Sequence, residues 1–271
     1  MQDAQHHAMN EYYELGREAE RLTETAQGRL EFERTQELLL RHLPTPPATV
    51  ADIGGGPGRY ATWLASLGYR VIHRDIVQLH VQQVRDAAAN GLSIEAAVGD
   101  ARALDLAASS VDAVLLLGPL YHLQRRTHRV QALAEARRVV RPGRPVLAAA
   151  ISRWATRLDG MLRQRIYLKY PDAGALIDEV ERTGVLPPLG PGSFCGFTHR
   201  PGQLRGEFRS AGLALADLVS IEGAAFLLND LDLHISDEHD WQVVLESARA
   251  HERVPELLGI GPHLLAVGVS G

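Results

Sequence analysis

Residues 50–59 read VADIGGGPGR, an apolar run that carries one aspartate and opens into a glycine-rich turn. Glycine has no side chain and tolerates a positive φ, so such a turn lets the backbone come close to a ligand. The short apolar run before the turn is typical of a strand, and the residues after it have helical spacing. This stretch therefore predicts a strand, a turn and a helix beside a small bound cofactor.

Short aliphatic runs alternate with amphipathic helical segments after this turn. The runs are 50–53, 70–72, 94–98, 111–117 and 146–151, and the helical segments between them are 60–67, 78–89 and 127–140. Later in the chain, two more runs follow at 216–221 and 264–269. This βαβ pattern predicts an α/β fold with a doubly wound, mostly parallel sheet of seven strands and helices on both faces.

The same pattern divides the chain into three parts. Residues 1–48 have helical periodicity that ends at Pro44, Pro46 and Pro47, and they predict an N-terminal helical cap. Residues 49–151 and 205–271 predict the sheet domain. The alternation lapses over residues 152–204, which predict a helical lid inserted between the fifth and sixth strands.

Composition excludes several classes of protein. The chain has 271 residues, of which 45% are hydrophobic, so it can bury a sizeable core. A net charge of −5 argues against a nucleic-acid partner, because such a surface needs a concentrated basic face. Cys195 is the only cysteine, which excludes an intramolecular disulfide and fits a cytoplasmic protein. No run of about 18 apolar residues predicts a membrane span, and the N-terminus does not read as a signal peptide.

Aspartates stand at the ends of three predicted strands. Asp52 ends the first strand, Asp75 the second and Asp100 the third. Ligands of an open parallel sheet bind at the carboxyl ends of its strands. One aspartate in such a place is more often a helix cap or a turn former. Three at one edge, behind a glycine turn, indicate a binding site.

Two cofactors compete for this edge. The pattern Gly56-x-Gly58-x-x-Ala61 matches the relaxed dinucleotide fingerprint, and Asp75 lies 19 residues after Gly56, which keeps an NAD(P)-dependent oxidoreductase open. A pyrophosphate, however, favours amides and a helix dipole without neighbouring anions. An acid-lined edge suits a cofactor with an ammonium and a sulfonium group better.

Residues 49–151 resemble the class I (Rossmann-like) S-adenosylmethionine-dependent methyltransferases of the small-molecule branch. Asp52-x-Gly54-x-Gly56-x-Gly58 is similar to the first motif of that family, and Leu117-Gly118-Pro119 resembles the end of its fourth-strand motif. Arg141-Pro142-Gly143 is similar to the turn before its fifth strand. The resemblance implies a Rossmann-like sheet with an antiparallel last strand. It also implies S-adenosylmethionine as cofactor and S-adenosylhomocysteine as product.

The resemblance also implies roles for individual residues. The glycines would approach the methionine part, with Asp52 near its ammonium group, and Asp75 would hold the ribose hydroxyls. Ile76 would lie beside the adenine, and the Asp100 carboxylate would accept from its amino group. The residues so assigned are Asp52, Gly54, Gly55, Gly56, Gly58, Asp75, Ile76, Asp100, Ala101 and Leu117, with Tyr12 and Tyr13 from an N-terminal helix that would fold over the cofactor. An aromatic pair at the start of an amphipathic helix is more often part of the core, which is the alternative for Tyr12 and Tyr13.

Tyr121 and His122 follow the fourth strand and would face the transferred methyl group. His122 is the candidate general base, since an imidazole titrates near neutral pH; the alternative is that both residues pack the first turn of a helix. Trp154, Phe197 and His199 of the lid are candidates for contact with the acceptor, although His199 could instead serve loop hydrogen bonding before a helix. No compact metal-ligand motif is present, so no metal is predicted.

These features together predict a methyltransferase that moves a methyl group from S-adenosylmethionine to the oxygen or nitrogen of a small molecule. The alternatives are an NAD(P)-dependent oxidoreductase and a non-methylating S-adenosylmethionine-binding protein of the same fold. The sequence leaves the acceptor and the oligomeric state open.

Overall fold

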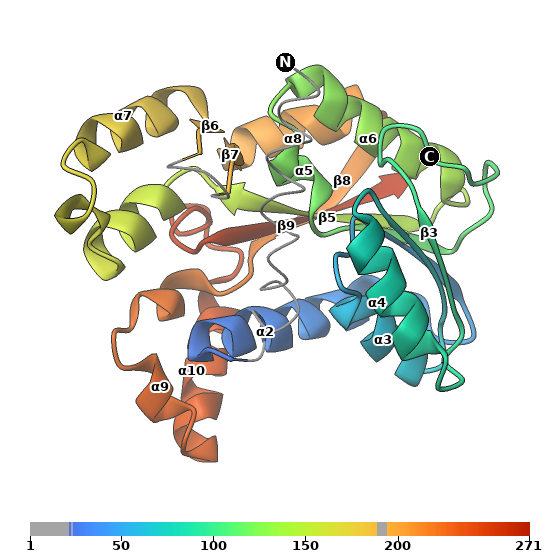
Figure 1. Ribbon diagram of the computed structural model, residues 1–271, viewed down its shortest axis with the longest axis horizontal. Coiled ribbons are helices and arrows are strands. Elements are labelled where there is room, and N and C mark those ends of the chain that lie inside the picture. Colours follow the sequence, from blue (N-terminus) through green and yellow to red (C-terminus); the bar gives the residue numbers. More distant parts are fainter. Residues whose placement is uncertain (1–21, 23, 189–193) are drawn as a thin grey trace.

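The computed structural model describes residue 22 and residues 24–188 and 194–271. Within them, five strands run parallel in the order β3-β2-β1-β4-β5. Their bounds are β1 (Thr49–Ile53), β2 (Arg70–Asp75), β3 (Ile94–Val98), β4 (Ala113–Leu116) and β5 (Pro145–Ser152). β9 (His263–Ser270) pairs antiparallel with β5, and β8 (Leu213–Ser220) pairs antiparallel with β9. The predicted mostly parallel sheet, with its antiparallel last strand, is confirmed (Figure 1).

Helices cover both faces of this sheet. On one face, α6 (Arg126–Val139) and α8 (Pro201–Ser210) pack against a core that includes Ile53 and Leu116. On the other face, α2 (Ala26–His42) and α3 (Arg59–Ser66) pack against Val50 and Leu115. Side chains alternate between the two faces because the strand period is two residues. The two layers of helices are visible on either side of the sheet (Figure 1).

The segment between β5 and α8 holds both helices and strands. It comprises a π-helix η2 (Thr156–Arg163), a 3₁₀ turn η3 (Ile166–Leu168), α7 (Ala173–Thr183), β6 (Val185–Leu186) and β7 (Gly196–His199). β7 pairs parallel with the end of β5, and β6 pairs antiparallel with β7. The sequence predicted helical structure only. β7 reads Gly-Phe-Thr-His, which is neither an alternating nor a continuous apolar run, so periodicity does not mark it as a strand although all four residues are buried.

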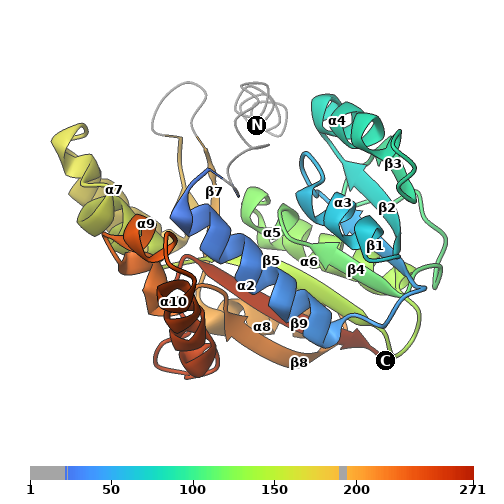
Figure 2. The same ribbon diagram turned by 90° about the horizontal axis from the view of Figure 1, so that it is seen from below.

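The segment between β8 and β9 forms a second small layer beside α2. It contains a 3₁₀ turn η4 (Gly223–Leu227), α9 (Leu231–His234) and α10 (Glu238–His251). Asp237 caps α10 by accepting a hydrogen bond from the Asp240 amide at 3.0 Å. Trp241 of α10 is fully buried against Leu30 of α2. Figure 2 shows α10 beside α2, so this segment fixes the position of α2.

The remaining helices of the described residues are α4 (Gln78–Ala88), which packs on β2 and β3, and the single turn α5 (Pro119–His122) after β4. Among the described helices, none is both long and apolar enough to cross a bilayer.

Candidate active site

A cavity lies at the carboxyl edge of β1, β2, β3 and β4. Its walls come from the turns that follow these strands, namely residues 54–57, 75–77, 99–102 and 117–119. Most of the residues that the sequence assigned to a cofactor line it: Gly54, Gly55, Gly56, Asp75, Ile76, Asp100, Ala101 and Leu117. Four chain segments far apart in sequence therefore meet at one edge, as the βαβ order requires.

The glycine turn has a conformation that needs glycine. Gly54 has a φ of +65° and Gly58 a φ of +83°, values that L residues rarely adopt. A Cβ on Gly54 would lie 2.7 Å from Pro119 Cγ, and one on Gly58 would overlap Val84 of α4. Gly58 itself does not line the cavity; it starts α3 and lets α4 pack closely. The turn thus serves both the cavity and the packing of the helices behind it.

Asp75 is held as an oriented anion at the cavity wall. Its carboxylate accepts hydrogen bonds from the Gly56 amide at 2.9 Å and the Val77 amide at 2.8 Å, and His80 Nδ1 lies 3.3 Å away. Burial raises the pKa of Asp75, but the hydrogen bonds from His80, Val77 and Gly56 outweigh it and keep the pKa below its usual value. Two backbone segments therefore fix a charged acceptor of hydrogen bonds at the end of β2.

Asp100 forms an ion pair with Arg102, whose guanidinium would compete with a ligand for the carboxylate. Arg102 Nε lies 2.9 Å from Asp100 Oδ1 and 3.1 Å from Oδ2, so the guanidinium grips both oxygens. This hydrogen bond raises the pKa of Arg102. Arg102 and His128 also line the cavity, so a guanidinium stands beside the carboxylate of Asp100 at this end.

Asp52 lies under the glycine turn instead of lining the cavity. It is fully buried, and a Cβ on Gly55 would overlap its carboxylate. The strand alternation turns Asp52 to the same face as Val50, where His73 Nδ1 is 3.5 Å from Oδ2. Its Oδ1 has no hydrogen-bond partner among the described residues. Asp52 therefore does not line the cavity, and its carboxylate lies directly beneath the turn at Gly55.

Tyr121 and His122 line the far end of the cavity from α5. The His122 ring lies 5.3 Å from the ring of Phe194, between their centroids. Burial lowers the pKa of His122 to about 4, partly offset by the charge of Asp75. The imidazole is therefore neutral at pH 7 and holds a proton weakly, which makes it a poor general base.

Trp154, Phe197 and His199, the lid candidates for contact with the acceptor, do not line this cavity. His199 is fully buried with its Nε2 3.2 Å from Glu207. Phe197 is buried beneath the Arg129 guanidinium, 3.6 Å from the ring centroid. Trp154 borders a separate surface depression beside Glu181. His199 and Phe197 therefore belong to a buried structural cluster around the Arg129–Glu207 ion pair. Tyr12 and Tyr13 lie outside the described residues.

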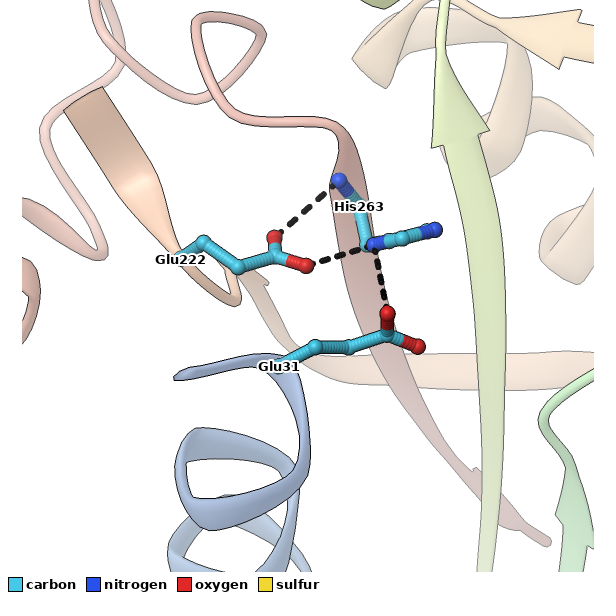
Figure 3. A group of neighbouring side chains, drawn as sticks. All are labelled: Glu31, Glu222 and His263. Carbon is cyan, nitrogen blue, oxygen red and sulfur yellow. Dashed lines mark hydrogen bonds and ion pairs between the residues drawn. The ribbon is translucent and has the colours of Figure 1, made fainter. Parts of the chain in front are cut away.

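The sequence reasoning missed three ionisable residues beside the same cavity (Figure 3). Glu31 comes from α2, Glu222 follows β8, and His263 begins β9; Glu31 and His263 line the cavity. His263 Nδ1 is 2.5 Å from Glu222 Oε1 and 4.0 Å from Glu31 Oε2. An antiparallel last strand starts at the edge where the parallel strands end, so the predicted strand 264–269 was a signal that pointed to His263.

Comparisons by sequence match part of this chain to methyltransferases. Residues 50–143 match a family model described as a methyltransferase domain. The ubiquinone/menaquinone biosynthesis C-methyltransferase UbiE of Acidiphilium cryptum is 38% identical over 104 residues. That match covers 37% of this chain and 41% of the relative, so the chain spans about two fifths of the relative's length.

Solved structures share the fold over most of the chain. A protein described as an S-adenosylmethionine-dependent methyltransferase from Methanosarcina mazei has a TM-score of 0.57 at 17% identity, over 86% of this chain and 96% of that one. The geranyl diphosphate C-methyltransferase of Streptomyces coelicolor was solved with Mg²⁺, geranyl diphosphate and S-adenosylhomocysteine. It has a TM-score of 0.54 at 14% identity, over 88% of this chain and 79% of that one.

Proposed function

We propose that this chain, which carries a class I S-adenosylmethionine-dependent methyltransferase domain with S-adenosylmethionine as its cofactor, transfers the methyl group to a small-molecule acceptor held in the same cavity. The observation that carries the proposal is the anionic Asp75 fixed behind the glycine turn at the cavity wall. A carboxylate held in this way suits a hydroxyl donor of a ribose, because Oδ2 accepts the Gly56 amide and keeps a second lone pair for a ligand.

Other residues of the cavity support the same cofactor. The amides and missing side chains of the glycine turn suit the methionine part, with the buried carboxylate of Asp52 beneath it. Oδ1 of Asp52 is buried without a hydrogen-bond partner among the described residues, so a positive charge above the turn would stabilise the carboxylate. Ile76 and Ala101 offer an apolar slot for a base between Asp75 and Asp100. When bound, the cofactor supplies an activated methyl group.

The chain's own contribution is to align the acceptor and exclude water, which are the main requirements of a methyl transfer. The acceptor end is walled by α5, by Ala149 of β5 and by Ile221 after β8. Apolar walls of this kind suit an aromatic or aliphatic molecule with one polar group. The UbiE relative is named as a C-methyltransferase. The proposed acceptor atom is therefore a carbon, an oxygen or a nitrogen.

Calorimetric titration of the full chain with S-adenosylmethionine, S-adenosylhomocysteine and NAD⁺ tests the cofactor. We expect both sulfur compounds to bind and NAD⁺ not to bind; binding of NAD⁺ alone would contradict the proposal. Incubation with methyl-labelled cofactor and a panel of small phenols, amines and quinols, followed by mass spectrometry, then tests transfer. A chain that binds S-adenosylhomocysteine but labels no compound in the panel would favour a non-methylating protein.

A further inference from the structure

A short hydrogen-bonded pair of a glutamate and a histidine stands at the acceptor end of the cavity. Glu222 is 2% exposed and holds His263 twice: its Oε1 lies 2.5 Å from Nδ1, and its Oε2 accepts the His263 backbone N–H at 3.2 Å. A carboxylate on one ring nitrogen fixes the tautomer and the orientation of an imidazole. The pair therefore holds His263 in one position with a proton on Nδ1.

The sheet topology directs this pair to the ligand edge. β9 is antiparallel to β5, with His263 opposite Ile151 near the end of β5, so the first residue of β9 enters at the edge where β1 to β5 end. β8 runs in the same direction as β5, so Glu222 follows β8 at that edge too. The Nε2 atom of His263 points away from both carboxylates (Figure 3), and His263 lines the cavity.

Of the two histidines at this end, His263 has the better surroundings for taking up a proton. His122 is kept neutral by burial, with its pKa lowered to about 4. His263 instead faces two carboxylates, Glu222 and Glu31, which stabilise the imidazolium that forms when Nε2 takes a proton. A buried carboxylate behind a histidine is the arrangement that supports general-base catalysis in hydrolases.

We propose that His263 is the general base of the methyl transfer and that Glu222 is its positioning residue, so that the acceptor is a molecule whose reacting atom carries a proton, an O–H or an acidic C–H. This inference rests on the proposed function. An acceptor such as a tertiary amine or a thioether, which has no proton to lose, would need neither residue.

The step balances in atoms and charge. Nε2 of His263 takes the proton from the acceptor, and the electron pair left on the acceptor forms the new bond to the methyl carbon. The carbon–sulfur bond breaks with its electron pair on sulfur, which leaves a neutral thioether. The positive charge moves from the sulfonium to the imidazolium between Glu222 and Glu31, and the proton then passes to water.

The same three side chains have ligand atoms within 4.8 Å of one another and could also hold a divalent cation. Nδ1 is engaged with Glu222 at 2.5 Å, so a cation would have to displace the proton between them. A metal role is therefore an outcome for the experiment to detect.

NMR of the full chain tests the pair without any acceptor. Side-chain ¹H–¹⁵N spectra, assigned by difference from His263→Gln, are expected to show His263 as the Nδ1–H tautomer with a strongly downfield proton. Glu222→Gln should move that proton upfield, and His251→Gln on the exposed face of α10 should leave it unchanged. An Nε2–H tautomer in the wild type would overturn the proposal.

Matched acceptors test the catalytic role. 4-Methylphenol keeps its proton at neutral pH, whereas 2,4-dinitrophenol is already ionised and needs no base; naphthols and 1,3-diketones extend the set. His263→Gln is expected to lower turnover of the un-ionised acceptors by about 10²- to 10⁴-fold. It should change turnover of the dinitrophenolate by less than about threefold, with unchanged affinity for S-adenosylhomocysteine. His251→Gln is the control and should alter neither.

Each other result has a separate meaning. An equal loss for both phenols would make His263 merely structural and overturn the proposal. Methylation confined to pyridines and thioethers would also overturn the proposal. The same holds for a wild-type chain that binds S-adenosylhomocysteine but methylates no O–H or C–H acid. Activity abolished by a chelator and restored by Mg²⁺ would replace the base with a metal site. A wild-type chain without affinity for S-adenosylhomocysteine would refute the proposed function itself, and this inference with it.

Discussion

At the scale of single residues, the candidate site depends on a few charged groups. The hydrogen-bond partners and position of each group indicate whether it is structural or can meet a ligand. Asp75 is kept charged at the cavity wall by amides and His80. Glu207 is just as buried, but its partners are Arg129 and His199 inside the protein, away from the cavity. Burial alone therefore does not identify a functional carboxylate. What distinguishes Asp75 is that its side chain also lines the cavity.

The role of Asp75 can be tested with an isosteric change. Asp75→Asn removes the charge but keeps the volume, and it should weaken binding of S-adenosylhomocysteine by about 1–3 kcal/mol through lost charge-assisted hydrogen bonds. Calorimetry of the full chain measures this. Asp86→Asn on the exposed side of α4 is the control and should bind normally. Unchanged affinity of the Asp75 variant would place the ribose elsewhere.

The Glu207 cluster should behave in the opposite way. Glu207→Gln leaves the buried Arg129 without its counter-charge, and it should lower the free energy of unfolding by about 3–5 kcal/mol, since breaking a buried ion pair is strongly destabilising. Binding of S-adenosylhomocysteine should stay within about twofold at temperatures where the variant is folded. Urea unfolding and calorimetry check the two halves. A loss of affinity without a loss of stability would mean that the Glu207 cluster supports the cofactor site.

At the scale of elements, periodicity and turn residues were enough to predict the strands of the central sheet and the glycine turn. They were not enough for β7, whose four residues are all buried, or for the burial of Asp52, which follows from the strand alternation that puts it beside His73. Glu222 and His263 were missed for a different reason. Each is a single ionisable residue at a strand end, and only the antiparallel pairing of β9 with β5 brings them to the cavity.

Contact between the glycine turn and α4 gives a prediction at this scale. Gly58→Ala should destabilise the protein by about 1–2 kcal/mol for the positive φ alone, plus the cost of the overlap with Val84. Val84→Ala makes room for the new methyl group, so the double variant should be more stable than the sum of the single changes by at least about 0.5 kcal/mol. Urea unfolding of the four proteins of this cycle measures the coupling. Strict additivity would mean that the turn moves away from α4.

At the scale of the whole molecule, the two halves of the cavity come from different parts of the chain. The half assigned to the cofactor is built from residues 50–143, the range that matches the methyltransferase family model. Glu31, Glu222 and His263 lie outside that range, on segments that α10 holds together by packing Trp241 against α2. In the proposed function, these three residues would stand beside the acceptor together with α5, so the acceptor end would combine residues from inside and outside the matched range.

The neutral state of His122 links the cavity to the stability of the whole protein. In the unfolded chain a histidine titrates near pH 6.5, whereas burial keeps the folded pKa of His122 at about 4. The unfolded state therefore binds more protons between these values. The contribution of His122 to the free energy of unfolding is fully present above pH 6.5 and is lost as the pH drops towards 4. The loss from this residue should be up to about 3 kcal/mol. Urea unfolding from pH 7 to pH 4 should show a shallower fall for His122→Gln than for the wild type. Parallel curves would mean that His122 carries a proton in the folded protein and that its cavity is more polar than its lining indicates.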